Sequence, residues 1–99
     1  MPARDTYHDA FKNALVKDGW TITHDPYHLP YEGKNMYVDL GAQQILAAER
    51  VTEKIAVEIK SFIGPSLLDD LKNAIGQYIL YRTVMSYQET DRRLYLAIP

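Results

Sequence analysis

The sequence predicts a mixed α/β fold in which one mixed β-sheet is flanked by helices. Apolar residues recur with helical spacing near the start of the chain and again after residue 66. Short runs rich in β-branched and aromatic residues lie between these two segments. The resulting order is α-β-β-β-β-α-β, and its last strand–helix–strand step, from Lys54 to Ile98, favours a right-handed parallel crossover.

Length and composition limit the possible classes of protein. A chain of 99 residues suffices for one small domain, so we expect residues 1–99 to form a single domain. The lack of cysteine excludes a disulfide framework and a Cys-based zinc site. No apolar stretch approaches the roughly 20 residues that cross a bilayer, and the N-terminus lacks the apolar core of a signal peptide. We therefore expect a cytoplasmic protein. A formal net charge of -2 means that binding to nucleic acid would need a local site or a metal.

The first helix is predicted from Asp5 to Asp18, with Gly19 placed to end it. Its apolar face has spacing i, i+3, i+4, i+7 and i+8 and consists of Tyr7, Ala10, Phe11, Ala14 and Leu15. The run Trp20–His24 then alternates as a short strand.

The middle of the chain is predicted to hold three strands. Asp25–Asn35 contains two prolines and a glycine and is predicted to be a surface loop. Met36–Leu40 is a short strand, which Gly41 bends or ends. Gln44–Arg50 and Lys54–Lys60 are further strands, joined as a hairpin by the tripeptide VTE.

The second helix begins after Ser66, a good N-cap, with Asp69 placed three residues on as in a capping box, and it ends near Ser86. One stripe of this helix consists of Leu68, Leu71, Ile75, Ile79 and Arg82, widened by Leu67, Ala74, Tyr78 and Tyr81. The last strand, Arg93–Ile98, has apolar residues on one face and ends the chain. Because a terminal strand usually needs cover, we expect a closing C-terminal segment to be absent from this chain.

The strand Lys54–Lys60 carries two opposite charges on one face. Side chains in a strand alternate between the two faces, so Glu58 and Lys60 point to the same side, opposite to Ile59 in the core. Burying charge is costly unless it is paired or binds a metal. One interpretation is a salt bridge at an exposed strand end.

A metal site is the other interpretation, and it needs a third group. Asp39, in the short strand Met36–Leu40, is expected to lie in the same sheet near Glu58. Two carboxylates and the backbone carbonyl of Ile59 would form a hard-oxygen site for Mg²⁺ or Mn²⁺. Lys60 would then reach a water on the metal or a nearby anionic oxygen. Such a site suits phosphodiester hydrolysis.

These residues resemble the motif of the PD-(D/E)xK nuclease superfamily. The matching stretches are VDLG with Asp39 and VEIKSF with Glu58 and Lys60. Such nucleases often carry Gln-x3-Tyr on the next helix, and Gln77 and Tyr81 stand at that spacing in GQYILYR. On pattern alone, the two residues are equally well the polar edge of an amphipathic helix. The resemblance implies a restriction-endonuclease-like fold, in which Gln77 and Tyr81 orient the lysine or the phosphate.

Nearly the whole chain also resembles the XisH family of controlling factors for excision of the fdxN DNA element in heterocyst-forming cyanobacteria. The similar stretches are YHDAFKNALVKDGWTITHDP, YVDLGAQQILAAER, IAVEIKSFIGPS and LKNAIGQYILYR. This resemblance implies a role in DNA rearrangement, beside a site-specific recombinase and a companion factor, XisI. It does not by itself imply that the protein cleaves DNA.

The first helix departs from the nuclease pattern. Many of these nucleases have a Glu eleven residues before a Gly–aromatic pair, and in this chain that position is His8, ahead of Gly19 and Trp20. Without that carboxylate, a second metal ion would be bound more weakly. His8 is either a further ligand for an ion such as Mn²⁺, a contact to a phosphate, or a structural histidine held by hydrogen bonds.

Other polar residues have two interpretations each. Glu49 is either a further acid on the sheet or a charge at a hairpin end. His24 and His28 lie in a Pro-rich loop without a third ligand, which favours surface residues. The scattered cations either follow a nucleic-acid backbone or are solvated, and they are Lys72, Arg82, Arg92 and Arg93.

Tyr27, Tyr31 and Tyr37 precede the Asp39 strand. They either cap the sheet, which is the interpretation we favour, or stack on bases or anchor a partner.

Two functions therefore remain open. One is a Mg²⁺- or Mn²⁺-dependent endonuclease that cuts DNA. The other is a regulatory module that keeps the nuclease frame and binds DNA, the recombinase or a XisI-like partner. An exposed sheet edge and the tyrosine-rich segment favour a homodimer or a heteromer.

Overall fold

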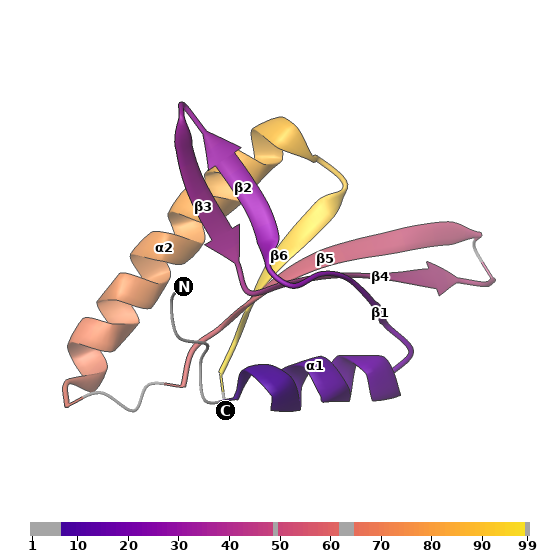
Figure 1. Cartoon of the computed structure of the whole chain (residues 1–99), viewed down its shortest axis with the longest axis horizontal. Helices are drawn as coiled ribbons and strands as arrows, with labels where there is room; N and C mark the ends of the chain where they lie inside the picture. Colours follow the sequence, from indigo (N-terminus) through magenta and orange to yellow (C-terminus); the bar gives the residue numbers. More distant parts are fainter. Residues whose placement is uncertain (1–6, 49, 62–64, 99) are drawn as a thin grey trace.

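The computed structural model describes residues 7–48, 50–61 and 65–98 and confirms a mixed α/β fold (Figure 1). The elements in chain order are α1 (His8–Lys17), β1 (Thr21–His24), β2 (Tyr27–Tyr31), β3 (Lys34–Val38), β4 (Leu40–Leu46), β5 (Val51–Ile59), α2 (Leu67–Gln88) and β6 (Arg92–Ala97). Four strands form one sheet in the order β1-β4-β5-β6, and β2 pairs with β3 in a separate hairpin. β5 and β6 are parallel, as predicted, and the other pairs are antiparallel.

The four-stranded sheet has a different cover on each face, and β5 contributes to both. Ile55, Val57 and Ile59 pack with residues of β4 and with Phe11 and Leu15 of α1. The opposite face is covered by α2 and the β2–β3 hairpin, which lie on the other side of the sheet from α1 in Figure 1. The predicted alternation is therefore confirmed, and Glu58 lies on the α2 face.

The segment Asp25–Asn35, which the sequence analysis assigns to a surface loop, instead contains β2 and the start of β3. The hairpin turn is formed by Glu32 and Gly33, which both have positive φ angles of 48° and 77°. Two such residues make the tight turn whose twist fits paired strands. Pro30 is tolerated because β2 belongs to a sheet of only two strands, where each strand is an edge.

Two other local predictions differ from the structure. Gly41 neither bends nor ends its strand but lies inside β4, paired with Ala56. A Cβ atom at Gly41 would lie 2.9 Å from His24 Nδ1 and 3.1 Å from Tyr27 Cδ2, so only glycine allows these rings to approach. The turn between β4 and β5 comes before Val51, earlier than the predicted VTE, so that β5 extends over nine residues.

The predicted helix boundaries are close to those observed. Ser66 caps α2, because its hydroxyl oxygen accepts a hydrogen bond from the Asp69 amide at 3.3 Å. The predicted start of the first helix at Asp5 lies outside the described residues, and so does Glu49. In the part of the chain that the structure describes, neither helix is long and apolar enough to cross a membrane.

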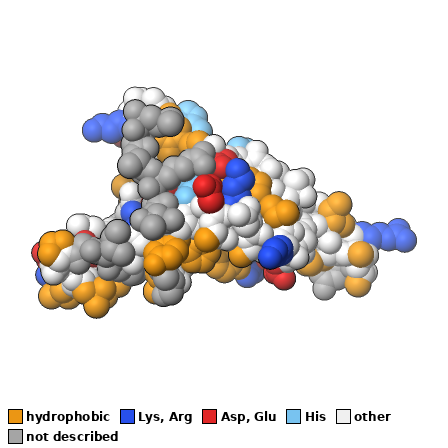
Figure 2. All heavy atoms as spheres, turned by 60° about the horizontal axis from the view of Figure 1, so that its bottom comes forward, with side chains coloured by type: hydrophobic (Ala, Val, Ile, Leu, Met, Phe, Trp, Pro, Cys, Tyr) orange, Lys and Arg blue, Asp and Glu red, His pale blue; other side chains and the backbone are white. Residues whose placement is uncertain are grey.

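The apolar stripe predicted on the second helix is largely exposed. Four large apolar side chains of this stripe are exposed to solvent: Leu68, Leu71, Ile75 and Ile79. The side of α2 that packs on the sheet is the neighbouring one, with Ala74, Tyr81, Val84 and Met85 buried. Space-filling atoms show hydrophobic side chains at the surface where α2 begins (Figure 2, lower left).

Candidate carboxylate–lysine site

Asp39 and Glu58 lie side by side because of the register of β4 and β5. Asp39 occupies the single position between β3 and β4. Leu40 pairs with Val57, and continuing that antiparallel register by one residue places Asp39 opposite Glu58. The predicted proximity of the two carboxylates is therefore a consequence of the sheet.

Each carboxylate is held by a backbone amide of the other strand. The Ile59 amide donates to Asp39 Oδ2 at 2.7 Å, and the Asp39 amide donates to Glu58 Oε1 at 3.2 Å. These two hydrogen bonds fix both side chains without neutralising either charge. Rigid strands thus orient the acidic pair, which suits a site that must bind a ligand with defined geometry.

Lys60 provides the positive charge next to this pair. Its Nζ atom lies 3.5 Å from Glu58 Oε2, and its side chain is 32% exposed while that of Glu58 is 6% exposed. The Lys60 amide donates to the Ala97 carbonyl at 3.0 Å, which keeps the backbone beside β6 after β5 has ended. The lysine therefore sits between the buried acid and solvent.

Burial, as the largest cause, and the nearby charge of Asp39 together raise the pKa of Glu58 to about 8, although Lys60 acts in the opposite direction. Two carboxylates that compete in this way are stabilised when a cation joins them. One lysine at a salt-bridge distance does not neutralise two acids. The pair of Asp39 and Glu58 is therefore an electrostatically unfavourable arrangement that a divalent cation would relieve.

α2 brings the remaining two predicted residues to this face of the sheet. Gln77 Nε2 donates to the Tyr81 hydroxyl at 2.8 Å, and Tyr81 is buried in the core beside the sheet. Burial raises the pKa of Tyr81, and the charges of Glu58 and Asp39 raise it as well. Tyr81 is thus close enough to sense both carboxylates, so the structure brings together Asp39, Glu58, Lys60, Gln77 and Tyr81.

His8 takes part in a separate cluster. Its Nε2 atom lies 2.8 Å from Asp25 Oδ1, and Lys12 donates to Asp25 Oδ2 at 2.7 Å. Burial raises the pKa of Asp25, but the hydrogen bonds from Lys12 and His8 outweigh it and leave the pKa below its ordinary value. The Nδ1 atom of His8 is buried and has no hydrogen-bond partner among the described residues. Its role as a metal ligand stays a prediction.

The two carboxylates supply only part of the ligand set that a hard divalent cation needs. Within residues 7–48, 50–61 and 65–98, no three His, Cys, Asp or Glu side chains are grouped so that they could hold a metal. A cation between Asp39 and Glu58 would therefore need backbone oxygen and water as further ligands. The backbone carbonyl of Ile59, which lies between Glu58 and Lys60 in the chain, is the predicted backbone ligand. Such mixed ligand sets are usual for Mg²⁺, which keeps several waters.

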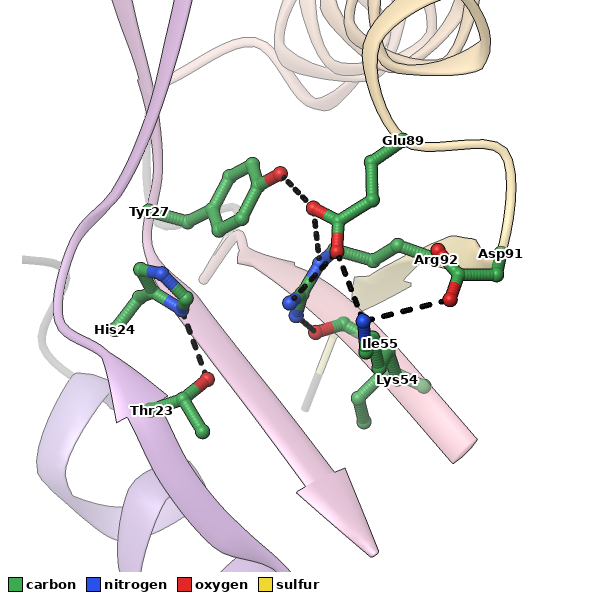
Figure 3. A network of polar contacts seen from close by, with 8 residues as sticks. All are labelled: Thr23, His24, Tyr27, Lys54, Ile55, Glu89, Asp91 and Arg92. Carbon is green, nitrogen blue, oxygen red and sulfur yellow. Dashed lines mark hydrogen bonds and ion pairs between the residues drawn. The ribbon is translucent and has the colours of Figure 1, made fainter. Parts of the chain in front are cut away.

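A second polar cluster was missed by the sequence analysis and lies at the other end of α2 (Figure 3). Arg92 was expected either to be solvated or to contact a nucleic-acid backbone. The structure instead buries it, with only 8% of the residue exposed. It contacts Glu89 through Nε at 3.1 Å and Nη2 at 3.3 Å, and Nη1 donates to the Ile55 carbonyl at 2.8 Å. The Tyr27 hydroxyl donates to Glu89 at 2.5 Å, and the guanidinium lies 4.7 Å from the Tyr27 ring centre.

This Glu89–Arg92–Tyr27 cluster joins the β2–β3 hairpin to the turn that follows α2. Burial raises the pKa of Glu89, but hydrogen bonds from Arg92 and Tyr27 outweigh it and lower the pKa to about 2. Burial and the hydrogen bond to Glu89 raise the pKa of Tyr27 to about 12. Tyr27 thus caps the sheet, which is the interpretation favoured from the sequence. The sequence offers no signal for this cluster, because its members come from β2, β6 and a turn.

The other polar residues singled out from the sequence lie at the surface where the structure describes them. His24 and His28 are exposed, and so are Lys72, Arg82 and Arg93. Tyr31 and Tyr37 are also exposed and, unlike Tyr27, do not cap the sheet as favoured from the sequence. The Tyr37 ring stacks on His28 with ring centres 5.2 Å apart.

Fold and site together define a small mixed α/β protein with a carboxylate pair and a lysine where two adjacent strands meet. Comparison with known families gives the particular group. The model described as "XisH protein" matches residues 1–99, and the chain belongs to the XisH family. No curated protein sequence matches significantly.

Two solved structures are similar to this chain. An XisH family protein from Nostoc punctiforme PCC 73102 is 41% identical, with a TM-score of 0.83, over 96% of this chain and 70% of that one. An fdxN element excision controlling factor protein from Anabaena variabilis is 43% identical, with a TM-score of 0.81, over 97% of this chain and 70% of that one.

Proposed function

We propose that this chain is a controlling factor for the programmed excision of a DNA element, and that it acts in the cytoplasm by hydrolysing a phosphodiester bond with Mg²⁺ or Mn²⁺. Its membership of the XisH family and its likeness to a protein described as an fdxN element excision controlling factor support the first part. The carboxylate–lysine site supports the second.

One observation carries the nuclease proposal. Glu58 is buried beside Asp39 with a pKa raised to about 8, in an arrangement that backbone amides fix but that no second cation neutralises among the described residues. A structural salt bridge would match its charges, because unpaired buried charge is costly. A divalent metal would displace the proton that the raised pKa keeps on Glu58 and would balance the charges of both carboxylates. The geometry therefore favours the metal site over the strand-end salt bridge.

Each residue of the carboxylate–lysine site has a separate role in this proposal. Asp39 and Glu58 hold the cation, which when bound supplies a Lewis acid and lowers the pKa of water. Lys60, one-third exposed beside Glu58, neutralises charge on the phosphate and positions the attacking water. Gln77 holds the Tyr81 hydroxyl by a hydrogen bond, and Tyr81 orients the lysine or the phosphate.

A cleavage assay tests this proposal. Supercoiled plasmid and branched DNA are incubated with the protein and Mg²⁺, Mn²⁺ or EDTA, and the products are resolved on gels. We expect metal-dependent nicking that Asp39→Ala and Lys60→Ala each reduce by at least about 100-fold, the size expected from loss of an electrostatic catalytic group. Lys34→Ala, which removes an exposed lysine of β3, is the matched control and should leave the rate unchanged.

Binding measurements separate catalysis from metal affinity. Calorimetric titration with Mn²⁺ should show one site in the wild-type protein and in Lys60→Ala, and none in Asp39→Ala. Titration without detectable heat in the wild-type protein, together with uncut DNA, would reject the nuclease proposal.

A second candidate is a regulatory module that binds DNA, a site-specific recombinase or a XisI-like protein without cutting. The observation that favours it is the position of His8, whose Nε2 atom pairs with Asp25. In the part of the chain that the structure describes, no third acidic or histidine side chain completes the metal site. DNA binding that is independent of metal and of Asp39 would support this module.

A further inference from the structure

Asp39 lies where the β2–β3 hairpin joins the four-stranded sheet. It is the single residue between β3, which belongs to the hairpin, and β4, which belongs to the sheet. The described strands of the hairpin and of the sheet are not paired with each other. The angle at which the hairpin meets the sheet therefore sets the backbone of Asp39 and the direction of its carboxylate. A ligand-binding group must be held within about 0.5 Å of its productive position, so this angle matters to the site.

Tyr27 packs against the chain on both sides of Asp39. On the hairpin side, Tyr27 pairs with Val38, the residue before Asp39. On the sheet side, the Tyr27 ring lies against Gly41, because a Cβ atom at Gly41 would be only 3.1 Å from Tyr27 Cδ2. Tyr27 is buried, with 7% of the residue exposed. A displaced Tyr27 ring would therefore shift the backbone on either side of Asp39.

The Glu89–Arg92–Tyr27 cluster connects this ring to β5, the strand that carries Glu58. The Tyr27 hydroxyl donates to Glu89, and both side chains point toward Arg92 (Figure 3). Arg92 contacts Glu89 through Nε and Nη2 and donates to the Ile55 carbonyl through Nη1. Ile55 precedes Glu58 by three residues on the same strand. The cluster thus ties the hairpin to the strand that holds the second carboxylate.

Other contacts of the hairpin give it less direction. Leu29 and Val38 pack in one apolar cluster with residues of α2, and apolar packing is non-directional. Gln88 donates to the Pro30 carbonyl, but this contact reaches the end of α2 and not the sheet. The hydrogen bond from Tyr27 is therefore the directional contact that orients the hairpin against β5.

We propose that Tyr27 is a positioning residue for Asp39, and that its hydroxyl, held by Glu89 and Arg92, orients the hairpin so that the Asp39 carboxylate stays beside Glu58. Two neighbouring carboxylates disfavour each other, so a loose junction would let Asp39 turn away. The cluster opposes this movement. The use of this positioning rests on the proposed function, in which Asp39 and Glu58 hold a cation.

The first test follows the Asp39 carboxylate in the metal-free protein. The Ile59 amide donates to Asp39 Oδ2 at 2.7 Å, and a short hydrogen bond to a carboxylate moves an amide proton resonance downfield. In NMR spectra of the full chain, Tyr27→Phe should move the Ile59 amide proton upfield and speed its exchange with solvent. The variant keeps the ring and removes only the hydroxyl.

Tyr78→Phe is the matched control. Its hydroxyl donates to the Leu94 carbonyl at 3.2 Å, so this variant also removes one hydrogen bond that joins two elements of the fold. Both variants should lose some thermal stability. Only Tyr27→Phe should move the Ile59 amide resonance.

Calorimetric titration with Mn²⁺ gives the functional readout. Loss of the outer support of a metal ligand typically costs 10- to 100-fold in metal affinity. Tyr27→Phe should therefore weaken the binding of Mn²⁺ by about 10-fold, and Tyr78→Phe should leave it unchanged.

A second pair of variants displaces the ring without removing its hydroxyl. Gly41→Ala places a methyl group against the Tyr27 ring and against His24, whose Nδ1 atom would lie 2.9 Å away. It is therefore combined with His24→Ala, which leaves the contact to Tyr27. This double variant should move the Ile59 amide resonance as Tyr27→Phe does. Gly76→Ala adds a methyl group with nothing within 4 Å, and neither it nor His24→Ala alone should move the resonance.

Two results would overturn the proposal. One is an Ile59 amide that keeps its wild-type resonance in Tyr27→Phe. The other is an equal shift in Tyr78→Phe, which would show a general loosening of the fold. If the Ile59 resonance moves as expected but the wild-type protein binds no Mn²⁺, Tyr27 does position Asp39 and it is the proposed metal site that fails.

Discussion

The two acidic clusters on the α2 side of the sheet have opposite electrostatic character. In the Glu89–Arg92–Tyr27 cluster the guanidinium makes a two-pronged contact to Glu89, and the pKa of Glu89 falls to about 2. In the carboxylate–lysine site, Glu58 lies beside Asp39, and its pKa rises to about 8. One cluster is neutralised by the protein itself and the other is not.

This difference distinguishes a structural cluster from a candidate ligand site. A cluster whose charges are matched stabilises the fold and leaves nothing to bind. A cluster in which two neighbouring carboxyl groups disfavour each other's ionisation lowers the stability of the free protein, which is a frequent property of functional sites. The two clusters should therefore respond in opposite directions to mutation and to pH.

The largest expected effect is on the neutralised cluster. Arg92→Met removes the guanidinium that holds Glu89 and the Ile55 carbonyl, and it should lower the free energy of unfolding by about 3 kcal/mol, as when one partner of a buried pair is lost. Urea denaturation at pH 7 measures it. The exposed neighbour Arg93 is the control, and Arg93→Met should change the stability by less than about 0.5 kcal/mol.

The second prediction concerns pH. The pKa of Glu58 rises from an ordinary 4.5 to about 8, so the folded state holds a proton that the unfolded state releases between these values. Stability should therefore fall as pH rises from about 4.5 to 8, by an amount on the order of a few kcal/mol in total. Glu89 acts in the opposite sense, since its stabilising charge is lost as pH falls from 4.5 towards 2.

Urea denaturation of wild type, Glu58→Gln and Glu89→Gln between pH 3 and pH 9 checks both slopes. Glu58→Gln should remove the loss of stability above pH 4.5, and Glu89→Gln should remove part of the loss below it. A wild-type protein whose stability rises from pH 5 to pH 8 would contradict this prediction, because Glu58 would then be ionised in the folded state with its charge matched.

The smallest effect is expected for the acid beside Glu58. Asp39→Asn keeps an oxygen that can accept the Ile59 amide but removes the charge, and it should raise the free energy of unfolding at pH 8 by about 1 kcal/mol. Urea denaturation without metal measures this gain. Asp25→Asn is the matched control and should lose stability, because Lys12 and His8 neutralise Asp25. A loss of stability in Asp39→Asn would make the carboxylate pair structural.

Local patterns predicted much of the fold and most of the candidate site. The period of two in β5 places Glu58 on the face opposite Ile59, and the hydroxyl of Ser66 marks the start of α2. The hairpin of β2 and β3 was missed because Pro30 and Gly33 are typical of loops. They are equally compatible with an edge strand and a tight turn, and only the partner strand selects between the two.

Where an element was recognised, as in β5 and α2, the sequence by itself determined which side chains share a face, because that period is a local property of the backbone. Tertiary structure decided which faces are buried and which charges are matched. The register of β4 on β5 places Asp39 beside Glu58, and the packing of the hairpin on α2 encloses Arg92 with Glu89. Among the described residues, the α2 stripe is exposed although its spacing is that of a buried face, because the side of a helix that packs on a sheet depends on contacts between distant segments, which no local pattern encodes.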